Sequence, residues 1–400
     1  MKILLLVDDY LPSTKSAPLM MKQLAGAFLR QEHEVMIVTP AGRWQRSRLS
    51  VEDGIPVFRF PSGRLKNVNM VSRTIHETLL SAVLIWYIVF RRKLLKCDLV
   101  VYYSPSIFWG TAVALLRAVF HAPSYLILRD IFPQWAIDNK LLKNWSPITW
   151  YFRFFEWINY HAADRIGVQS EANTRYFRGK KAEEKVSVLY NWFDTNGILT
   201  TGSGLRDKLH WHDRVIFFYG GNIGIAQDMD NLMRLAKRLN DFPDAALLFV
   251  GSGDACKLIE ARINEWQLTN TVLLPAVPQK EYFELLSQID VGLFSLAPEH
   301  RTHNFPGKLL GYMAYGKPIL GSVNKGNDLK EVFVRYRIGL ISDNPDDETL
   351  FENARALLTG SALRRELGEN GRRCLAEKFN VDKNARIIID QCIDDLGKVQ

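Results

Sequence analysis

Two glycine-rich segments in the second half of the chain are candidate phosphate-binding turns. They span residues 220–224 and 251–254, and each follows a short apolar run that is typical of a buried strand. Glycine lets backbone N–H groups approach an anion closely and permits positive φ angles. Glycines that merely end strands are the alternative, and neither segment has the spacing of a dinucleotide fingerprint or of a P-loop. The binding candidates in these segments are Gly221, Asn222, Gly224, Gly251 and Gly253.

A third candidate is the segment NFPGKLLGYMAYGKP at residues 304–318. Pro306 and Gly307 are typical of a helix start, and the closing Gly-Lys-Pro is typical of a helix end. A helix N-terminus presents free N–H groups and a partial positive charge, so Lys308 in the first turn is unfavourable for the helix alone. We interpret Lys308, Gly307 and the helix start as a site for a diphosphate. A solvated lysine is the alternative.

Charged side chains also follow two predicted strands of the first half. Arg129 and Asp130 come directly after the apolar run 124–128, and the loop 8–16 follows the first apolar run. Open α/β sheets bind ligands at the carboxyl ends of their strands, so both places are candidates for chemistry. A structural ion pair between Arg129 and Asp130 is the alternative, as is an N-cap role for Asp8 or Asp9.

Metal and acyl-hydrolase chemistry have little support. His300 and His303 lack a third ligand at metal spacing, so we expect no metal site. No G-x-S-x-G elbow is present. The four cysteines form no C-x-x-C pair, which favours a reducing, cytosolic location.

Strands and helices alternate through both halves, which predicts two doubly wound α/β domains. The polar, glycine-containing stretch 194–213 interrupts this alternation. We therefore predict an N-terminal domain over 1–194, a linker over 195–213, a second domain over 214–380 and a C-terminal helix over 381–400. The predicted strands are 1–7, 34–39, 57–60, 98–103, 124–128, 165–168, 215–219, 245–250, 272–274, 291–295 and 319–322.

The positive charge is concentrated in the first half. The chain has 51 Lys and Arg and 43 Asp and Glu; residues 1–200 carry a net charge of +10 and residues 201–400 a net charge of −2. This asymmetry predicts an anionic partner for the first half, either a membrane surface or an acidic substrate. Nucleic acid is not expected, because no known nucleic-acid-binding signature accompanies the charge.

The most apolar stretch covers residues 79–90, LLSAVLIWYIVF, and runs into Arg91, Arg92, Lys93 and Lys96. Twelve residues are too few to span a bilayer as a helix. A short apolar helix with a basic end can instead lie in the headgroup region of an anionic membrane. A core helix packed on the first sheet is the alternative.

The sequence resembles the retaining, nucleotide-sugar-dependent glycosyltransferases of family 4, which have the GT-B fold of two Rossmann-like domains facing an interdomain cleft. The likeness covers nearly the whole chain. It is carried by the segments EHEV (32–35), RDIFP (129–133), QSE (169–171), YNW (190–192), YGGNIG (219–224), VGSG (250–253), PGK (306–308) and YMAYGKP (312–318). The branch it looks most like transfers N-acetylated amino sugars, such as N-acetyl-fucosamine, in O-antigen and capsule assembly.

The chain departs from this family at several functional positions. Lys15 and Ser16, on the acceptor-side loop, stand where the family usually has two glycines, and Arg129 stands where it has a histidine. Asn222 and Gln227 replace an Arg and a Lys that hold the diphosphate in many members. The family's two glutamates of E-x7-E fall on His303 and Gly311, so the nucleotide ribose must be held without the usual Glu.

The resemblance implies a retaining transferase whose donor is a nucleotide sugar, with UDP expected as the nucleotide. Lys308 and the residue 221–224 turn would hold the diphosphate without a metal or other cofactor. Asp130 would orient the sugar or the acceptor, and Arg129 would supply charge in the cleft. The implied acceptor is a lipid-linked saccharide at the inner face of the cytoplasmic membrane. A nucleotide-sugar epimerase and an inactive binding subunit with the same fold are the alternatives.

Overall fold

The computed structural model describes residues 1–13, 16–65, 68–138, 140–196, 204–298 and 305–396. The chain forms two compact units: the first combines Met1–Asn191 with the C-terminal segment that begins at Val381, and the second is Trp192–Asn380. Helix α15 (Val381–Leu396) packs against α1 (Ser16–Arg30), where Arg30 pairs with Asp382 at 2.8 Å. The C-terminal helix is therefore part of the first unit and not a separate element.

The predicted linker is also partly structured. Helix α7 (Leu205–Leu209) lies within it, and Leu205 is buried in the second unit. Arg206 donates a hydrogen bond of 2.6 Å to Asp290, next to β12 (Val291–Ser295). Residues 204–213 therefore belong to the second unit, and the rest of the predicted linker after residue 196 lies outside the described residues.

The first unit is built on an eight-stranded sheet in the order β3-β4-β2-β1-β5-β6-β7-β8. All neighbours pair in parallel except β3 and β4, which form an antiparallel hairpin at one edge. The strands are β1 (Lys2–Leu6), β2 (Glu34–Pro40), β3 (Arg48–Glu52), β4 (Ile55–Phe60), β5 (Leu99–Ser104), β6 (Ser124–Leu128), β7 (Arg165–Val168) and β8 (Val186–Val188).

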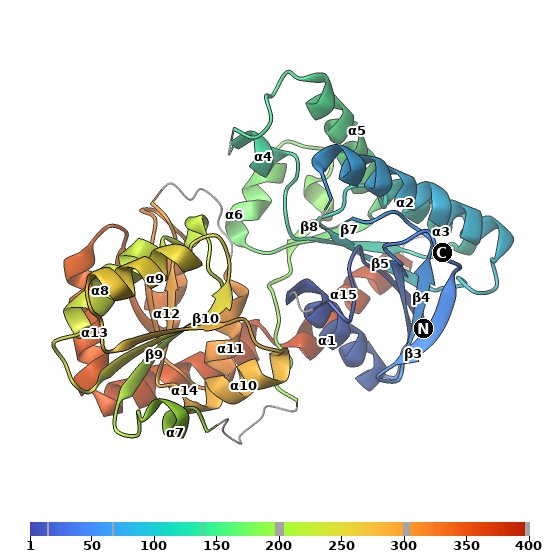
Figure 1. Ribbon diagram of the computed structural model, residues 1–400. Coiled ribbons are helices and arrows are strands. Elements are labelled where there is room, and N and C mark those ends of the chain that lie inside the picture. Colours follow the sequence, from blue (N-terminus) through green and yellow to red (C-terminus); the bar gives the residue numbers. More distant parts are fainter. Residues whose placement is uncertain (14–15, 66–67, 139, 197–203, 299–304, 397–400) are drawn as a thin grey trace. The chain divides into compact units, whose positions relative to one another are not determined.

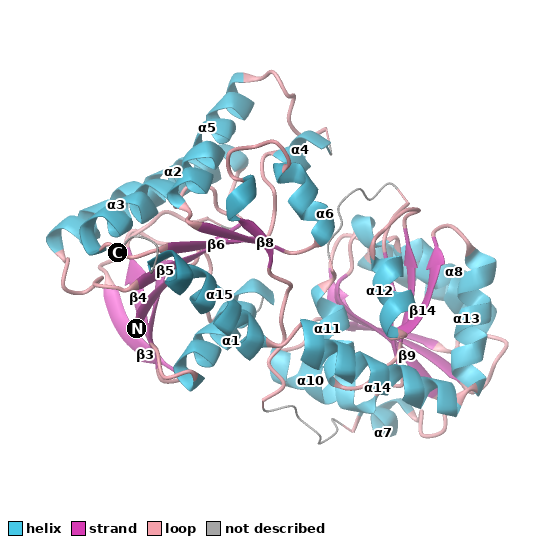
Figure 2. Ribbon diagram, turned by 180° about the vertical axis from the view of Figure 1, so that it is seen from behind, coloured by secondary structure: helices cyan, strands magenta, loops and turns pink. Residues whose placement is uncertain are grey.

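Helices cover both faces of this sheet, with α1 and α15 on one face and three other helices on the opposite face (Figures 1 and 2). These three are α2 (Met70–Phe90), α3 (Gly110–Phe120) and α5 (Pro147–Ala162). The remaining short helices of the unit are α4 (Gln134–Asp138), α6 (Glu171–Thr174) and the 3₁₀ turns η1 (Arg175–Phe177) and η2 (Glu183–Lys185).

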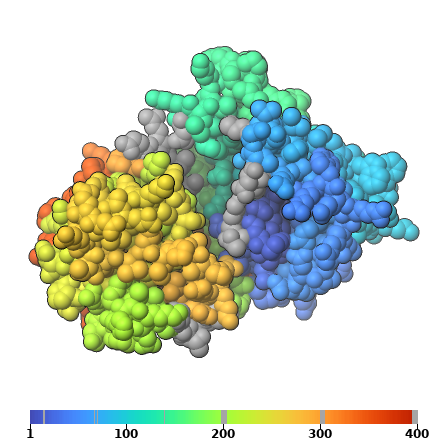
Figure 3. Space-filling view, viewed as in Figure 1, coloured from blue at the N-terminus to red at the C-terminus, as the bar shows by residue number. Residues whose placement is uncertain are grey.

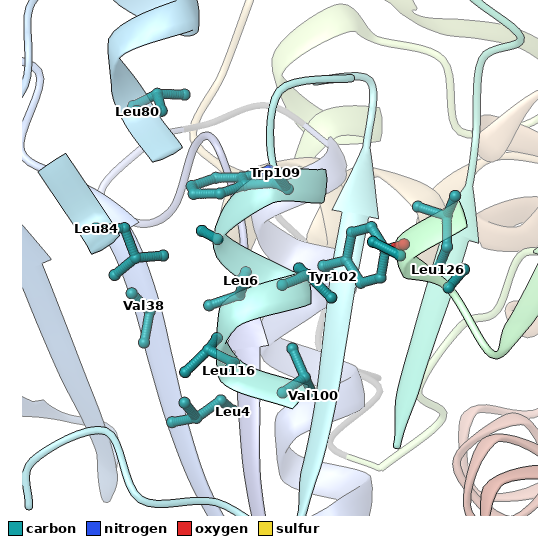
Figure 4. Packing of buried hydrophobic residues seen from close by; sticks show 14 of the residues in the cluster. Leu4, Leu6, Val38, Leu80, Leu84, Val100, Tyr102, Trp109, Leu116 and Leu126 are labelled. Atoms are coloured by element: carbon teal, nitrogen blue, oxygen red, sulfur yellow. The ribbon is translucent and has the colours of Figure 1, made fainter. Parts of the chain in front are cut away.

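The core of the first unit lies between the sheet and α2, α3 and α5. Strand side chains alternate between the two faces, so Leu4 and Leu6 point to these helices. Figure 4 shows them meeting Leu84 of α2 and Leu116 of α3, all fully buried. Burial of apolar side chains on this scale is the main force that fixes the helices on the sheet.

The second unit has a six-stranded, fully parallel sheet in the order β11-β10-β9-β12-β13-β14. Side chains of β9 alternate: Phe217 and Tyr219 lie in the core under α8, α9 and α13, whereas the Phe218 ring contacts Tyr282 of α10 and Tyr312 of α11. The sheet is thus covered on both faces, as a parallel sheet requires.

The remaining strands of this unit are β9 (Val215–Asn222), β10 (Ala245–Ser252), β11 (Thr271–Pro275), β13 (Ile319–Val323) and β14 (Gly339–Asp343). Its other helices are α8 (Met229–Leu239), α9 (Cys256–Glu265), α10 (Gln279–Gln288), α11 (Gly307–Ala314), α12 (Leu329–Tyr336), α13 (Asp347–Thr359), α14 (Ser361–Lys378) and the 3₁₀ turn η3 (Ile225–Gln227). Every strand predicted from the sequence is present, and β3, β8 and β14 were not predicted.

Candidate functional site

The two glycine-rich segments lie side by side at the carboxyl ends of β9 and β10. Both strands continue into them, since Gly221 pairs with Gly251 and Asn222 with Ser252 in the parallel ladder. A Cβ atom on Gly251 would lie only 1.9 Å from the Gly221 carbonyl oxygen, and Gly221 itself has φ +112°. Gly251 is therefore required by the close approach of the two backbones and Gly221 by its positive φ, and the parallel pairing of β9 and β10 brings the two segments together.

The turn after β9 is fixed by the side chain of Gln227. Its Oε1 atom accepts hydrogen bonds from Asn222 Nδ2 at 2.9 Å and from the Gly224 N–H at 3.2 Å. Asn222 and Gln227 are thus bonded to each other and shape the loop. A hollow of about 430 Å³ adjoins them, and its lining includes Asp254 from the β10 turn.

Gly253 holds the second turn against the first. A Cβ there would lie 2.1 Å from the Ile223 carbonyl oxygen, so no side chain fits. Ile223 donates to the Ser252 carbonyl at 3.0 Å, and Ala255 donates to the Ile223 carbonyl at 3.0 Å. These bonds tie the residue 221–224 turn and the residue 251–254 turn into one rigid rim.

Lys308 brings a cation to this rim. Its Nζ atom lies 3.4 Å from the ring centroid of Tyr219, and a Cβ on Gly221 would lie 4.0 Å from it. Among the described residues, Nζ has no hydrogen-bond partner although it is buried. Burial alone lowers the pKa of Lys308 well below its ordinary value. The alternative of a solvated lysine is therefore wrong: this is a desolvated amine held over an aromatic ring, next to a glycine turn.

Two tyrosines hold Lys308 and the rim in place, and the sequence analysis missed both. Tyr219 supplies the ring under Lys308, and its hydroxyl donates to the Asn222 carbonyl at 2.6 Å. The Tyr312 hydroxyl accepts from the Gly220 N–H at 3.3 Å and so fastens α11 to β9. Two features of the sequence could have indicated them: Tyr219 directly precedes the glycine turn, and Tyr312 lies in the predicted helix that contains Lys308.

The other candidates of the second unit are placed differently. Gly307 lies at the start of α11, and a Cβ there would meet nothing, so the residue is not needed for space. Gly311 is buried, and its Cβ would lie 3.2 Å from Leu286 of α10. The structure thus gives Gly311 a reason in the packing of α11 against α10. His303 lies outside the described residues.

In the first unit, Arg129 is held at the carboxyl end of β6 by neutral partners. Its Nη1 atom donates to Asn191 Oδ1 at 3.0 Å and approaches the Met20 sulfur at 3.1 Å. Gln169, after β7, donates to the Arg129 carbonyl at 3.2 Å. The segments RDIFP, QSE and YNW therefore meet at the carboxyl edge of the sheet. Their contact there explains why the three motifs occur in the same sequence.

Two acids lie at the same edge. Burial is the main cause that raises the pKa of Tyr103, at the end of β5, to about 12; the charge of Arg129 opposes the rise, and those of Asp130 and Asp8 contribute to it. Asp8 is itself buried. This part of the sheet edge therefore combines a fixed guanidinium with carboxylates from β1 and β6.

The loop after β1 borders a hollow of about 290 Å³ whose lining includes Asp9, Ser13 and Arg64. Arg59 fixes this loop by donating to the Leu11 carbonyl at 2.6 Å. Ser16 is exposed at the first residue of α1, and Lys15 lies outside the described residues. No group of three or more potential metal ligands occurs among the residues that the structure describes.

Family models match both units. Residues 19–192 match the glycosyl transferase 4-like domain, and residues 205–374 match the glycosyl transferases group 1 model. Each unit therefore matches a family model of glycosyltransferases, and the two doubly wound units have the GT-B fold. This confirms the predicted fold class.

A curated relative supports the same class. The chain is 25% identical over 243 residues to the probable glycosyltransferase WbjE of Pseudomonas aeruginosa. The match covers 58% of this chain and 60% of the relative, which is less than two thirds of its length.

Solved structures agree in fold at low identity. The sucrose-phosphate synthase tll1590 of Thermosynechococcus elongatus has a TM-score of 0.72 at 16% identity, with all of both chains covered. HepE (Alr3699) of Anabaena, in complex with UDP and glucose, has a TM-score of 0.70 at 17% identity and 98% coverage of each chain. WaaG, a glycosyltransferase involved in lipopolysaccharide biosynthesis, has a TM-score of 0.67 at 16% identity, covering 96% of this chain and 99% of WaaG.

Proposed function

We propose that this protein transfers a sugar from a UDP-sugar to an acceptor hydroxyl, with the donor diphosphate held at the rim formed by β9, β10 and α11. The observation that carries the proposal is the buried Nζ of Lys308 next to Gly221, which has no hydrogen-bond partner in the part of the chain that the structure describes. An amine desolvated in this way is costly unless an anion meets it. A diphosphate would supply that anion and favour the protonated form of Lys308.

The proposed chemistry needs little covalent work from the protein. The bond from the anomeric carbon to the phosphate oxygen breaks, the bond to the acceptor oxygen forms on the same face, and the acceptor proton passes to the leaving diphosphate. Retention of configuration follows from this front-side course. Lys308 and the backbone N–H groups at the start of α11 would stabilise the growing negative charge, which is the task that preorganised donors perform best. No metal ion is required in this scheme.

Asp130 and Arg129 would act on the sugar or the acceptor. They are rigidly placed at one sheet edge, and orienting a hydroxyl for attack requires such fixed groups. We further propose an N-acetylated amino sugar as the transferred group and a lipid-linked saccharide as the acceptor, in assembly of O-antigen or capsule. The support is the motif set of the sequence, the similarity to WbjE and the fold shared with WaaG.

The proposed location is the inner face of the cytoplasmic membrane, where the protein would bind as a peripheral protein. The charge of residues 1–200 supports an anionic surface as partner. The comparisons do not favour the epimerase alternative, because both family models are those of glycosyltransferases.

The test is a thermal-shift panel of UDP-, GDP- and dTDP-sugars, followed by donor hydrolysis with the purified protein. Only a ligand that binds the folded protein raises the melting temperature by mass action, so the panel identifies the nucleotide and the hydrolysis assay identifies a true donor. Stabilisation by UDP-sugars, together with slow release of UDP, is expected. A protein that binds no nucleotide sugar would contradict the donor site, and one that binds UDP-sugars without ever cleaving them would be an inactive binding subunit.

A further inference from the structure

Most of the solvent-facing side chains of α2 are apolar, and Arg73 is the charged residue exposed among them. Six of the apolar side chains recur every three or four residues and so form one stripe, roughly 28 Å long at the rise of an α-helix. The opposite side of the helix carries Leu80, Leu84 and Ile88, which are buried in the core. A helix of a globular protein normally turns charged or polar residues to water. The stripe comprises Val71, Ile75, Leu79, Ala82, Trp86 and Phe90.

The solvent-facing side of α5 is aromatic. Trp150, Phe154 and Trp157 recur at the same helical spacing, and each is more than half exposed. The segment before the helix adds Trp145, which is 82% exposed, and the first turn of the helix adds Ile148. The inner side of α5 packs in the interior of the unit through buried residues such as Phe152.

These two faces belong to one layer. The hydroxyl groups of Thr78 in α2 and Tyr151 in α5 are hydrogen-bonded at 2.5 Å, and α3 packs against both helices. Figures 1 and 2 show the three helices together on the same face of the sheet, and the segment before α5 forms the green tip of the first unit in Figure 3. The exposed residues of α3 are Ala114 and Ala118. We call the exposed side chains of α2, α3 and residues 145–157 the apolar layer.

Basic residues lie at the margin of the apolar layer. Arg92 donates to the Val119 carbonyl at the end of α3, at 2.9 Å, so the basic run after α2 is tied to the layer. Lys140 and Lys143 are exposed just before α5. From residue 70 to 162 the chain has ten Lys and Arg but only five Asp and Glu. An apolar face with a basic margin is complementary to an anionic lipid surface.

We propose that the apolar layer is the surface by which this protein sits in the headgroup region of an anionic bilayer, with the aromatic side chains of α5 as its main anchors. Tryptophan is favoured at that depth because it joins a large apolar ring to an N–H that stays hydrated. Helix α2 has the length and composition of a membrane-spanning helix. Its buried inner side makes it lie on the bilayer, because spanning would expose the core of the first unit.

A bilayer suits this layer better than a second copy of the chain. Two copies facing each other would bring like-charged margins together, which is unfavourable. The inference rests on the proposed function in one respect: a lipid-linked acceptor gives the enzyme a reason to remain at the membrane. It goes beyond that proposal by assigning the anchoring to α5, whose aromatic face the sequence did not reveal.

The experiment is co-sedimentation with phosphatidylcholine vesicles, with and without phosphatidylglycerol. Three variants are compared with the wild type: Trp150→Gln/Phe154→Gln/Trp157→Gln on α5, Arg91→Gln/Arg92→Gln/Lys93→Gln/Lys96→Gln at the margin, and Leu49→Gln/Val51→Gln as the control. The control removes two exposed apolar side chains from β3 of the same unit, which are 54% and 70% exposed. Melting temperatures and the shift produced by UDP show that each variant is folded.

We expect the α5 variant to lose at least about tenfold in vesicle affinity at every salt concentration, since it removes buried apolar contact. The margin variant should lose affinity only on anionic vesicles and at low salt, because screening weakens its charges. The control should bind as the wild type does. An α5 variant that binds as tightly as the wild type would overturn the proposal. So would a wild type that ignores vesicles and forms a dimer, by light scattering, that the α5 variant cannot form.

The result is separable from the proposed function. Vesicle binding needs no sugar donor, and donor hydrolysis to water needs no membrane. Loss of vesicle binding with UDP-sugar hydrolysis intact would contradict the apolar layer alone. Vesicle binding without any donor hydrolysis would contradict the proposed catalysis and leave the apolar layer standing.

Discussion

The two units share one architecture but present opposite chemistry on their outer helices. Of 23 large apolar side chains exposed among the described residues, 20 lie in the first unit and three in the second. In the second unit, the outer side of α8 forms salt bridges with its neighbours. Arg234 pairs with Asp347 of α13 at 2.6 Å, and Arg262 of α9 pairs with Asp230 at 2.9 Å. A doubly wound fold requires apolar residues only on the side of each helix that packs on the sheet. The residues of the outer side can therefore serve another function, which in the first unit we take to be membrane binding.

The carboxyl edges of the two sheets differ as well. In the second unit the edge is a backbone rim beside the desolvated amine of Lys308, which suits an anion of fixed shape. In the first unit it is a set of charged and amide side chains around Arg129, which suits hydroxyl groups. The contrast predicts that substitutions at the two edges affect different steps of the reaction.

The largest effect is expected for Lys308→Ala. Turnover should fall by 10²-fold or more, because one preorganised donor to a developing charge contributes about 3–4 kcal/mol. The measurement is UDP release with saturating donor, and a circular dichroism spectrum shows whether the fold is intact. Activity within about threefold of the wild type would remove Lys308 from the diphosphate site, since that is under 1 kcal/mol.

Asp130→Asn tests the edge of the first unit. Transfer should fall by at least about tenfold, because a fixed charge that orients the reacting groups is lost. Affinity for UDP should not change, since Asp130 and the glycine rim belong to different units. Calorimetric titration with UDP measures this affinity. A large loss of UDP affinity would show that donor binding is not confined to the edge of the second unit.

Lys308→Met should make the ligand-free protein more stable by on the order of 1 kcal/mol, since an unsatisfied buried polar group is replaced by an apolar one. Burial lowers the pKa of Lys308 below its ordinary 10.5, so the unfolded chain binds a proton that the folded protein lacks. Wild-type stability should therefore rise with pH from the lowered pKa up to 10.5, and the advantage of the variant should shrink over the same range.

Urea unfolding at about pH 7 and about pH 10 measures this difference. Lys317→Met is a matched control, because the Lys317 amine is also buried but donates to the Ile289 carbonyl at 2.7 Å. That variant leaves an acceptor unsatisfied and should be less stable than the wild type. If both variants lose stability alike, Lys308 is satisfied in the ligand-free protein.

Much of the fold could be predicted from the sequence because strand and helix periods are local signals. The apolar runs of the parallel strands are short and continuous, and all the predicted ones are present. Strands β3 and β8 were missed because β3 is an exposed edge strand and β8 has only three residues. The docking of α15 on α1 could not be predicted, because its amphipathic pattern fits either unit.

The site was partly predictable for the same reason. Glycines 221, 251 and 253 and Lys308 stand in recognisable turns, and the structure brings them together. The role of Tyr219 depends on which ring lies under Lys308, and the aromatic face of α5 depends on which side of that helix meets the core. Both are long-range packing outcomes that no local pattern encodes.

The smallest effect is expected for Asp347→Asn in the ion-pair network of the second unit. Asp347 accepts from Arg234 at 2.6 Å, but both side chains are about one third exposed, at 33% and 39%. Exposed pairs of this kind contribute about 1 kcal/mol or less and are weakened by salt. Urea unfolding at low and high salt should show a small loss that salt removes, and binding to anionic vesicles should not change. A loss of vesicle binding would mean that the charged helices of the second unit also meet the membrane, and the division of surfaces between the two units would be wrong.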